Sequence, residues 1–156
     1  MLMFDWDSID EATCRGRLLD LVSRINRGAL FDLYRTANGF HGFLISEACS
    51  PRRKRSIEWS RIVKSDPKYL WMSVARGHYD VRLSPKHQND RINEHVDRIG
   101  SAKANDRLTK VILAHDLITK WTQDISNTDW KTQSIDWFEM LTNVCEGIDE
   151  ATNADD

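Results

Sequence analysis

Hydrophobic positions in the first half of the chain change their spacing several times. Residues 2–7 alternate between apolar and polar side chains, which is the period of a half-buried strand. Residues 9–27 then carry apolar side chains at helical spacing, and Ser8 with Glu11 has the form of a capping box. Two extended runs, 29–35 and 40–45, flank the turn-forming segment Ala37–Asn38–Gly39. The first 45 residues therefore predict a strand, a helix and a hairpin.

Further along, the pattern predicts one more helix and one more extended region before the chain becomes helical. A helix is expected over 56–64, stopped by Asp66–Pro67. Residues 69–74 and 78–84 alternate again and are expected to be extended, with a break at 75–77. Three helices are expected over 89–99, 105–125 and 129–148.

This order of elements predicts an α+β fold. Residues 1–84 read β-α-β-β-α-β, the RRM or ferredoxin-like unit, followed by a helical C-terminal portion. In that unit the first and third strands lie side by side at the centre, and the fourth strand lies beside the first. We expect a sheet domain over 1–86, a helical extension of about three helices over 87–148, and an acidic disordered tail over 149–156.

Composition and charge narrow the class of protein. The 156 residues are 40% hydrophobic and 29% charged, as in ordinary globular proteins. The net charge is −2, but five carboxylates lie in the last stretch, so the remainder is about +3 by subtraction. Mild basicity is compatible with nucleic-acid binding. The three cysteines form no CxxC pair, and no apolar run approaches the ~20 residues of a membrane span. We expect a cytoplasmic protein with no membrane partner.

The first strand carries the candidate chemistry. Asp5 and Asp7 are two residues apart, so their side chains share one face of the strand, about 6–7 Å from each other. Such a pair repels itself unless a cation lies between the carboxylates, and Mg²⁺ or Mn²⁺ prefers oxygen ligands. The alternative interpretation is a solvated strand end. In the expected sheet, His41 on the third strand and Asp80 on the fourth fall on the same face as Asp5 and Asp7.

Three short motifs give this set a family resemblance. Phe4–Asp5–Trp6–Asp7 is a hydrophobic strand ending in Asp-x-Asp, Gly39–Phe40–His41 is a small-x-His strand, and Tyr79–Asp80 is a hydrophobic-Asp pair. Their order resembles the motifs of the archaeo-eukaryotic primase superfamily, the primase-polymerases, over roughly the first half of the chain. In that family the acidic residues hold two divalent metals and the histidine contacts the phosphates of the incoming nucleotide.

The resemblance implies a metal-dependent nucleotidyltransferase that acts in DNA replication on nucleoside triphosphates and a DNA or RNA template, with a replication protein as partner. Asp5, Asp7 and Asp80 would be the catalytic ligands of Mg²⁺ or Mn²⁺, and His41 would bind the nucleotide. We add Arg82 and Lys86 as further phosphate contacts. The basic loop is a candidate nucleic-acid contact; its residues are Arg52, Arg53, Lys54 and Arg55.

Two other functions remain open at this point. An RRM-like nucleic-acid-binding module without catalysis would stack bases on Phe43, Ile45 and nearby aromatic residues. A small protein-binding adaptor or inhibitor would use the helical half and the acidic tail. His95 follows Arg91 by four residues in the helix expected over 89–99. This spacing resembles the Arg/His pair of small helical ribonucleases, but a solvated helix face is the simpler interpretation.

Overall fold

The computed structural model describes residues 1–80 and 93–126 and confirms the α+β class. The chain divides into two compact units: residues 1–81 with 93–108, and residues 82–92 with 109–156. The elements, in chain order, are β1 (Met3–Asp7), α1 (Glu11–Arg24), β2 (Leu30–Arg35), β3 (Gly39–Leu44), α2 (Lys54–Ile62), α3 (Pro67–Arg76), β4 (Glu94–Gly100) and α4 (Asp106–Ser126). No helix among these residues is long and apolar enough to cross a bilayer.

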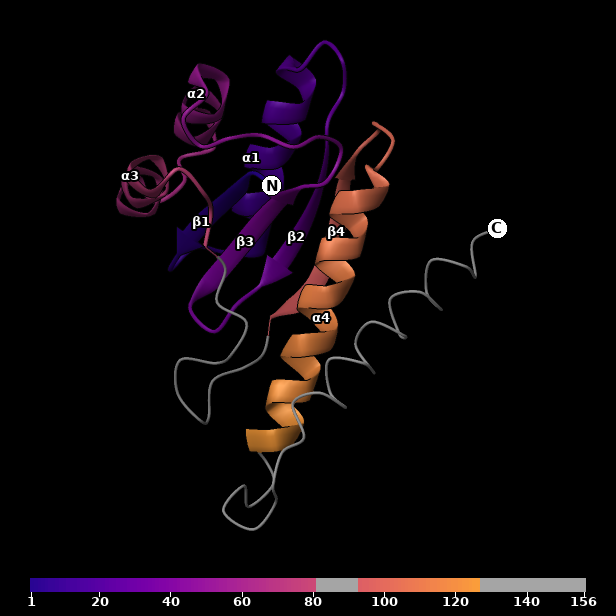
Figure 1. Ribbon diagram of the computed structural model, residues 1–156. Coiled ribbons are helices and arrows are strands. Elements are labelled where there is room, and N and C mark those ends of the chain that lie inside the picture. The colour runs from indigo at the N-terminus through magenta and orange to yellow at the C-terminus, as the bar shows by residue number, and fades with distance from the viewer. Residues whose placement is uncertain (81–92, 127–156) are drawn as a thin grey trace. The chain divides into compact units, whose positions relative to one another are not determined.

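The four described strands form one antiparallel sheet in the order β1-β3-β2-β4 (Figure 1). The predicted hairpin is present as β2 and β3, and the predicted pairing of the first and third strands is present as β1 and β3. The fourth described strand differs from the ferredoxin-like expectation, because β4 pairs with β2 and not with β1. In the described part of the chain, β1 and β4 are therefore the two edges of the sheet.

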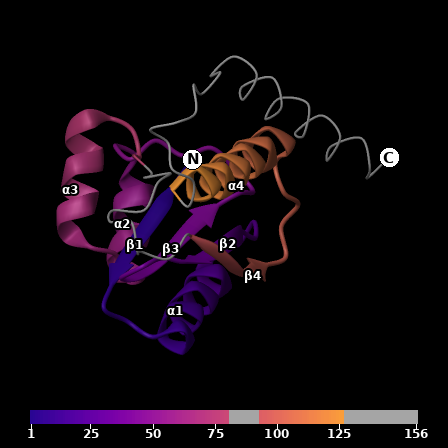
Figure 2. The same ribbon diagram turned by 90° about the horizontal axis from the view of Figure 1, so that it is seen from below.

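The hydrophobic core lies on the face of the sheet that α1 covers (Figure 2). Alternate residues of β1 and β2 point into it, and the helix adds a stripe spaced by three and four residues. Its members include Phe4, Trp6, Phe31, Leu33, Cys14, Leu18 and Leu21, each no more than 2% exposed. The rings of Phe4 and Phe31 stack with centroids 5.6 Å apart, which joins the two outer strands of the β1-β3-β2 ladder across the face of β3.

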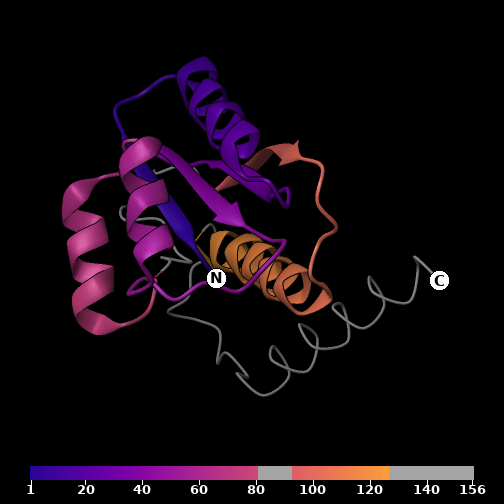
Figure 3. The same ribbon diagram turned by 90° about the horizontal axis from the view of Figure 1, so that it is seen from above.

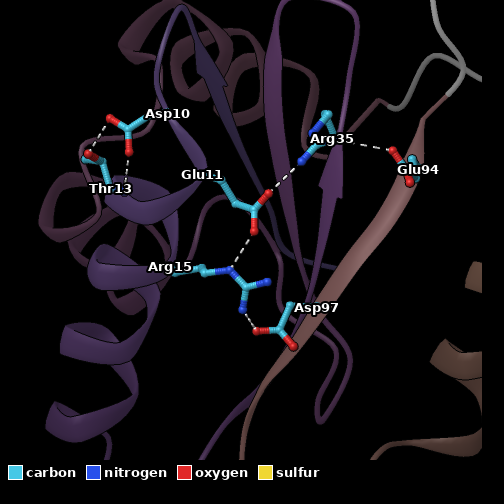
Figure 4. Close-up of polar contacts among 7 residues, drawn as sticks. All are labelled: Asp10, Glu11, Thr13, Arg15, Arg35, Glu94 and Asp97. Atoms are coloured by element: carbon cyan, nitrogen blue, oxygen red, sulfur yellow. Dashed lines mark hydrogen bonds and ion pairs between the residues drawn. The ribbon is translucent and has the colours of Figure 1, made fainter.

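The start of α1 differs from the capping box that the sequence predicts. Asp10, and not Ser8, is the N-cap, and its carboxylate accepts a 2.8 Å hydrogen bond from the Thr13 amide. Glu11 is thereby free of a capping role, and its carboxylate accepts hydrogen bonds from Arg15 at 2.9 Å and Arg35 at 2.6 Å (Figure 4). The helix still begins where its apolar stripe begins.

The connection between α2 and α3 covers the open edge of β1 (Figure 3). The Asp5 amide donates to the Ser65 hydroxyl at 3.0 Å, and the Asp66 amide donates to the Asp5 carbonyl at 2.8 Å. The Trp6 indole donates to the Val63 carbonyl at 2.8 Å. Unpaired backbone groups at a sheet edge invite wrong pairing, and these bonds satisfy them.

Residues 69–74 are helical in α3, so the extended conformation predicted for them is wrong. The Asp66 carboxylate accepts hydrogen bonds from the amides of Lys68 and Tyr69, and Pro67 occupies the first turn. Gly77 ends the helix in the left-handed conformation, with φ of 83°. Asp66–Pro67 therefore starts a helix as well as separating it from α2. Residues 78–80 are not a strand, and 81–84 lie outside the described residues.

The helix predicted over 89–99 is also wrong, because 94–100 form β4. Arg98 lies opposite Asp32 and Ile99 opposite Phe31, while a register shift at Leu33 and Tyr34 accommodates one extra residue. The few apolar residues of this segment fit both the helical and the strand period, and pairing with the buried strand β2 selects the strand. The helix predicted over 105–125 is confirmed as α4, and the one predicted over 129–148 lies outside the described residues.

Candidate functional site

Polar side chains lie on the sheet face opposite α1. Its centre is closed, because Tyr34 and Phe43 are 1% and 0% exposed. The face is accessible toward the β1 edge, where the side chains of Asp5 and His41 are 20% and 15% exposed. The sequence-predicted site lies at this edge.

Asp5 and His41 are direct cross-strand partners in the β1–β3 ladder. His41 Nε2 lies 3.3 Å from the Asp5 carboxylate, and the ring of His41 meets Phe43 edge-on at 6.0 Å. His41 Nδ1 is buried and has no hydrogen-bond partner among the described residues. A buried side-chain nitrogen without a partner is uncommon in folded proteins, so His41 is a candidate for contact with a ligand.

Asp80 is also linked to this edge, but through a contact with α3 and not by lying on a strand of the sheet. The Tyr69 hydroxyl on α3 donates to the Asp80 carbonyl at 3.1 Å and lies 3.6 Å from the Met3 sulfur on β1. Burial raises the pKa of the Tyr69 phenol above its usual range, and the negative charges of Asp5 and Asp80 add to this effect. Both carboxylates are therefore within electrostatic reach of one phenol, although Asp80 is not on a strand.

The Asp80 carboxylate already has partners. It forms ion pairs with Arg76 and, at 3.0 Å, with His78, and the hydrogen bond from Arg76 lowers its pKa. Asp80 would have to leave these partners to join Asp5 in holding a cation. The structure brings Asp80 toward the site without making it part of a formed ligand set.

A cavity of about 400 Å³ lies at the end of β1. Two carboxylates, Asp7 and Asp66, line it together with two cationic side chains, Arg17 and Lys64. Ser8 and Lys64, which also line it, hold φ values of 54° and 51°, in the left-handed region that non-glycine residues seldom adopt. Such strain often occurs at functional sites. The cavity thus contains two positive and two negative side chains, and Asp7, the second carboxylate of the Asp-x-Asp motif, is one of the negative ones.

The acidic residues fit a divalent cation in a limited way. Within residues 1–80 and 93–126, no group of three or more His, Cys, Asp or Glu side chains is arranged as a ligand set. Mg²⁺ typically takes one or two carboxylates from the protein and the remaining oxygens from water and substrate phosphates. Asp5 and Asp7, alternate residues of one strand, can supply such a pair. These two carboxylates would therefore suit a cation whose other ligands are water and substrate phosphate oxygens, and they do not form a complete set of protein ligands.

The basic loop does not present its four cations to one ligand. Arg52 donates to the carbonyls of Val74 and Ala75 at 3.0 and 2.9 Å, so it caps the end of α3. Arg55 contacts Glu47 at 2.7 Å. The remaining two side chains, Arg53 and Lys54, are exposed.

A second polar cluster, which we did not predict from the sequence, lies toward the opposite edge of the sheet. Asp32 on β2 is 1% exposed, and Arg98 on β4 donates to both its oxygens, at 2.7 and 3.0 Å. His95 Nε2 lies 3.4 Å from the same carboxylate. The alternation of polar and apolar residues over 94–100 could have indicated the strand β4. We did not predict that strand, because the spacing of its apolar residues also fits a helix.

Two further sets of predicted residues have different outcomes. Phe43 and Ile45, offered for base stacking in an RRM-like module, are both 0% exposed and cannot stack on a base as placed. Arg82 and Lys86, offered as phosphate contacts, lie outside the described residues.

Comparisons of the chain with protein-family models, with curated proteins and with solved structures find no match. A functional proposal for the β1 edge therefore rests on its sequence motifs and its geometry.

Proposed function

We propose that the protein is a metal-dependent nucleotidyltransferase of the primase-polymerase type, acting on nucleoside triphosphates with a nucleic-acid template. The observation that carries this proposal is the cross-strand contact between Asp5 and His41, 3.3 Å apart at the edge of the sheet. The two residues come from separate motifs, 36 positions apart in the sequence. The proposal uses the β1–β3 pair and does not require a complete ferredoxin-like strand order.

Each residue has a defined task in this proposal. Asp5 and Asp7 bind the cation, and His41, oriented by Asp5 and Phe43, contacts a phosphate oxygen of the nucleotide. Arg17 and Lys64 in the adjoining cavity offset the charge of the remaining phosphates. When bound, Mg²⁺ or Mn²⁺ would polarise the phosphate and favour attack at phosphorus. Asp80 is the candidate third carboxylate, available once it releases Arg76 and His78.

The test compares thermal unfolding of the natural protein, Asp5→Asn and Asp7→Asn, with and without Mn²⁺ and a mixture of nucleoside triphosphates. Ligand that binds only the folded state raises the midpoint by mass action. We expect a rise of several degrees in the natural protein and a clearly smaller rise in either variant. A primer-synthesis assay on a single-stranded template then measures nucleotide incorporation, which should be lost in both variants.

Glu58→Gln is the matched control, because Glu58 is an exposed carboxylate on α2 whose partner, Lys54, lines neither cavity. It should keep the full response to Mn²⁺ and triphosphate. An equal rise in Asp5→Asn would overturn the proposal, because the nucleotide would then bind away from Asp5. No rise in the natural protein would overturn it as well and would favour the protein-binding alternative. Asp80→Asn separates a two-carboxylate site, which it leaves intact, from a three-carboxylate site, which it abolishes.

A further inference from the structure

A second cavity, of about 410 Å³, lies where the end of α1, the start of α2 and the loop after β4 meet. Four cationic side chains line it: Arg24, Arg27, Arg55 and Lys103. Glu47 is the carboxylate in its lining, and Trp59 forms part of its wall. All these residues belong to the first compact unit, so the cavity is formed within one body.

The ion pairs of these residues leave the cavity positive. Arg24 pairs with Asp20 at 2.9 Å and Arg55 with Glu47 at 2.7 Å. Within the described ranges, Arg27 and Lys103 have no carboxylate partner, so two positive charges are not neutralised locally. Two uncompensated cations at a concave site match a ligand that carries two or more negative charges.

Arg55 is held in position for such a ligand by its other contacts. Its guanidinium lies 5.4 Å from the centre of the Trp59 ring and 3.1 Å from the Cys49 sulfur. Its Nε is buried and has no hydrogen-bond partner among the described residues. An arginine fixed by stacking loses little side-chain entropy when an anion binds.

Helix dipoles do not determine whether this cavity favours an anion or a cation. Arg55 is in the first turn of α2, where the N-cap makes no side-chain hydrogen bond and acidic residues are absent. That end of a helix favours an anion, but Arg24 marks the end of α1, where the dipole has the opposite sign. The two effects oppose each other, and the excess of side-chain cations determines the preference.

We propose that this cavity is a metal-independent binding site for a phosphate group with two or more negative charges. Such a group occurs as free polyphosphate and as the terminal phosphate of a nucleic-acid strand. The volume is in the range of ordinary small-ligand sites. The site is separate from the Asp5–His41 edge and goes beyond the proposed transferase activity.

The experiment is titration calorimetry in EDTA, which removes divalent cations and silences any response of Asp5 and Asp7. Sodium tripolyphosphate is the first probe. The natural protein is compared with Arg27→Gln/Lys103→Gln, which removes the two unpaired cations. We expect binding to the natural protein and at least about tenfold weaker binding to this variant, the effect of losing one charge-assisted contact or more.

Arg61→Gln/Lys68→Gln is the control, since it changes the net charge equally at exposed positions that do not line the cavity. It should bind tripolyphosphate as the natural protein does. Absence of binding, or equal weakening in both double variants, would overturn the proposal. Oligonucleotides with a 5′-phosphate form the second arm: competition with tripolyphosphate assigns the site to strand ends, and its absence assigns it to free polyphosphate.

The outcome is independent of the transferase test. Asp5→Asn should bind tripolyphosphate normally in EDTA, whether or not the protein transfers nucleotides.

Discussion

Asp32 shows how a single buried charge constrains its neighbours. Its carboxylate is 1% exposed on β2, so the folded state tolerates it only because Arg98 donates to both oxygens. The hydrogen bonds that Arg98 donates to Asp32 raise the pKa of Arg98, which keeps the guanidinium charged. A buried carboxylate that loses its partner carries the full cost of desolvation.

Arg98→Met is therefore expected to lower the free energy of unfolding by about 2 kcal/mol, less than for a fully buried pair because Arg98 is half exposed. Urea denaturation measures the change. Arg98→Met combined with Asp32→Asn should recover part of the loss, since no charge is then left buried.

Lys54→Met provides the comparison at the surface. Lys54 lies 3.8 Å from Glu58 and its side chain is 90% exposed, so its loss should cost less than about 0.5 kcal/mol. If Arg98→Met costs no more than Lys54→Met, the Asp32 pair does not stabilise the sheet.

At the scale of elements, two glycines have opposite roles. A Cβ on Gly39 of β3 would lie 1.8 Å from the Trp6 carbonyl oxygen of β1, so the two backbones can approach only because the side chain is absent. Gly16, in the middle of α1, has open space around the same position. The first glycine is required by strand pairing, and the second only weakens a helix.

Gly39→Ala should destabilise the protein by about 3 kcal/mol or more, because β1 must move away from β3. Gly16→Ala should stabilise it by up to about 1 kcal/mol. Thermal and urea unfolding of the two variants measure both effects. Similar changes of the same sign would show that the close approach of β1 and β3 is not needed.

At the scale of the whole sheet unit, Glu11 connects α1 with two strands that are distant in sequence. Its carboxylate joins Arg15 and Arg35, which in turn pair with Asp97 and Glu94 on β4 (Figure 4). The chain of contacts runs from the helix through β2 to the edge of the sheet. It holds β4, the last of the described strands in chain order, against the first helix.

This network predicts a pH dependence. Hydrogen bonds from Arg15 and Arg35 lower the pKa of Glu11 from its usual 4.5. A carboxylate with a lowered pKa stabilises the folded state above its unfolded pKa, and this stabilisation is lost as the pH falls through its folded pKa. Glu11→Gln should therefore unfold at a lower temperature than the natural protein at pH 7, and the difference should disappear toward pH 3.

Thermal unfolding between pH 7 and pH 3 measures the effect, with Glu58→Gln as the control. Glu58 pairs with Lys54 at 3.8 Å and both side chains are mostly exposed, so its variant should follow the natural protein across the range. A constant difference for Glu11→Gln at every pH would show that the carboxylate charge is not what joins the helix to the sheet.

The candidate site combines residues that the sequence could predict with residues that it could not. Asp5 and His41 were predictable, because alternation sets the face of a strand and the Ala37–Asn38–Gly39 turn sets the hairpin that carries His41. Asp32 and His95 were not, because nothing local indicates that β4 pairs with β2. The approach of Asp80 to β1 depends on Tyr69, 11 residues away on a helix that had been expected to be a strand.

The sequence by itself determined the elements whose pattern is local and strong: β1, α1, the β2–β3 hairpin, α2 and α4. Periodicity and turn chemistry act within a few residues, so they can be read directly. Tertiary structure decided β4 and the strand order, because these depend on which edge of the sheet remained open. The start of α3 is local, since Asp66 caps it and Pro67 occupies its first turn, but we interpreted this pair only as the end of the preceding helix. A segment such as 94–100 fits two periods equally well, and only the burial gained by pairing with β2 selects one of them.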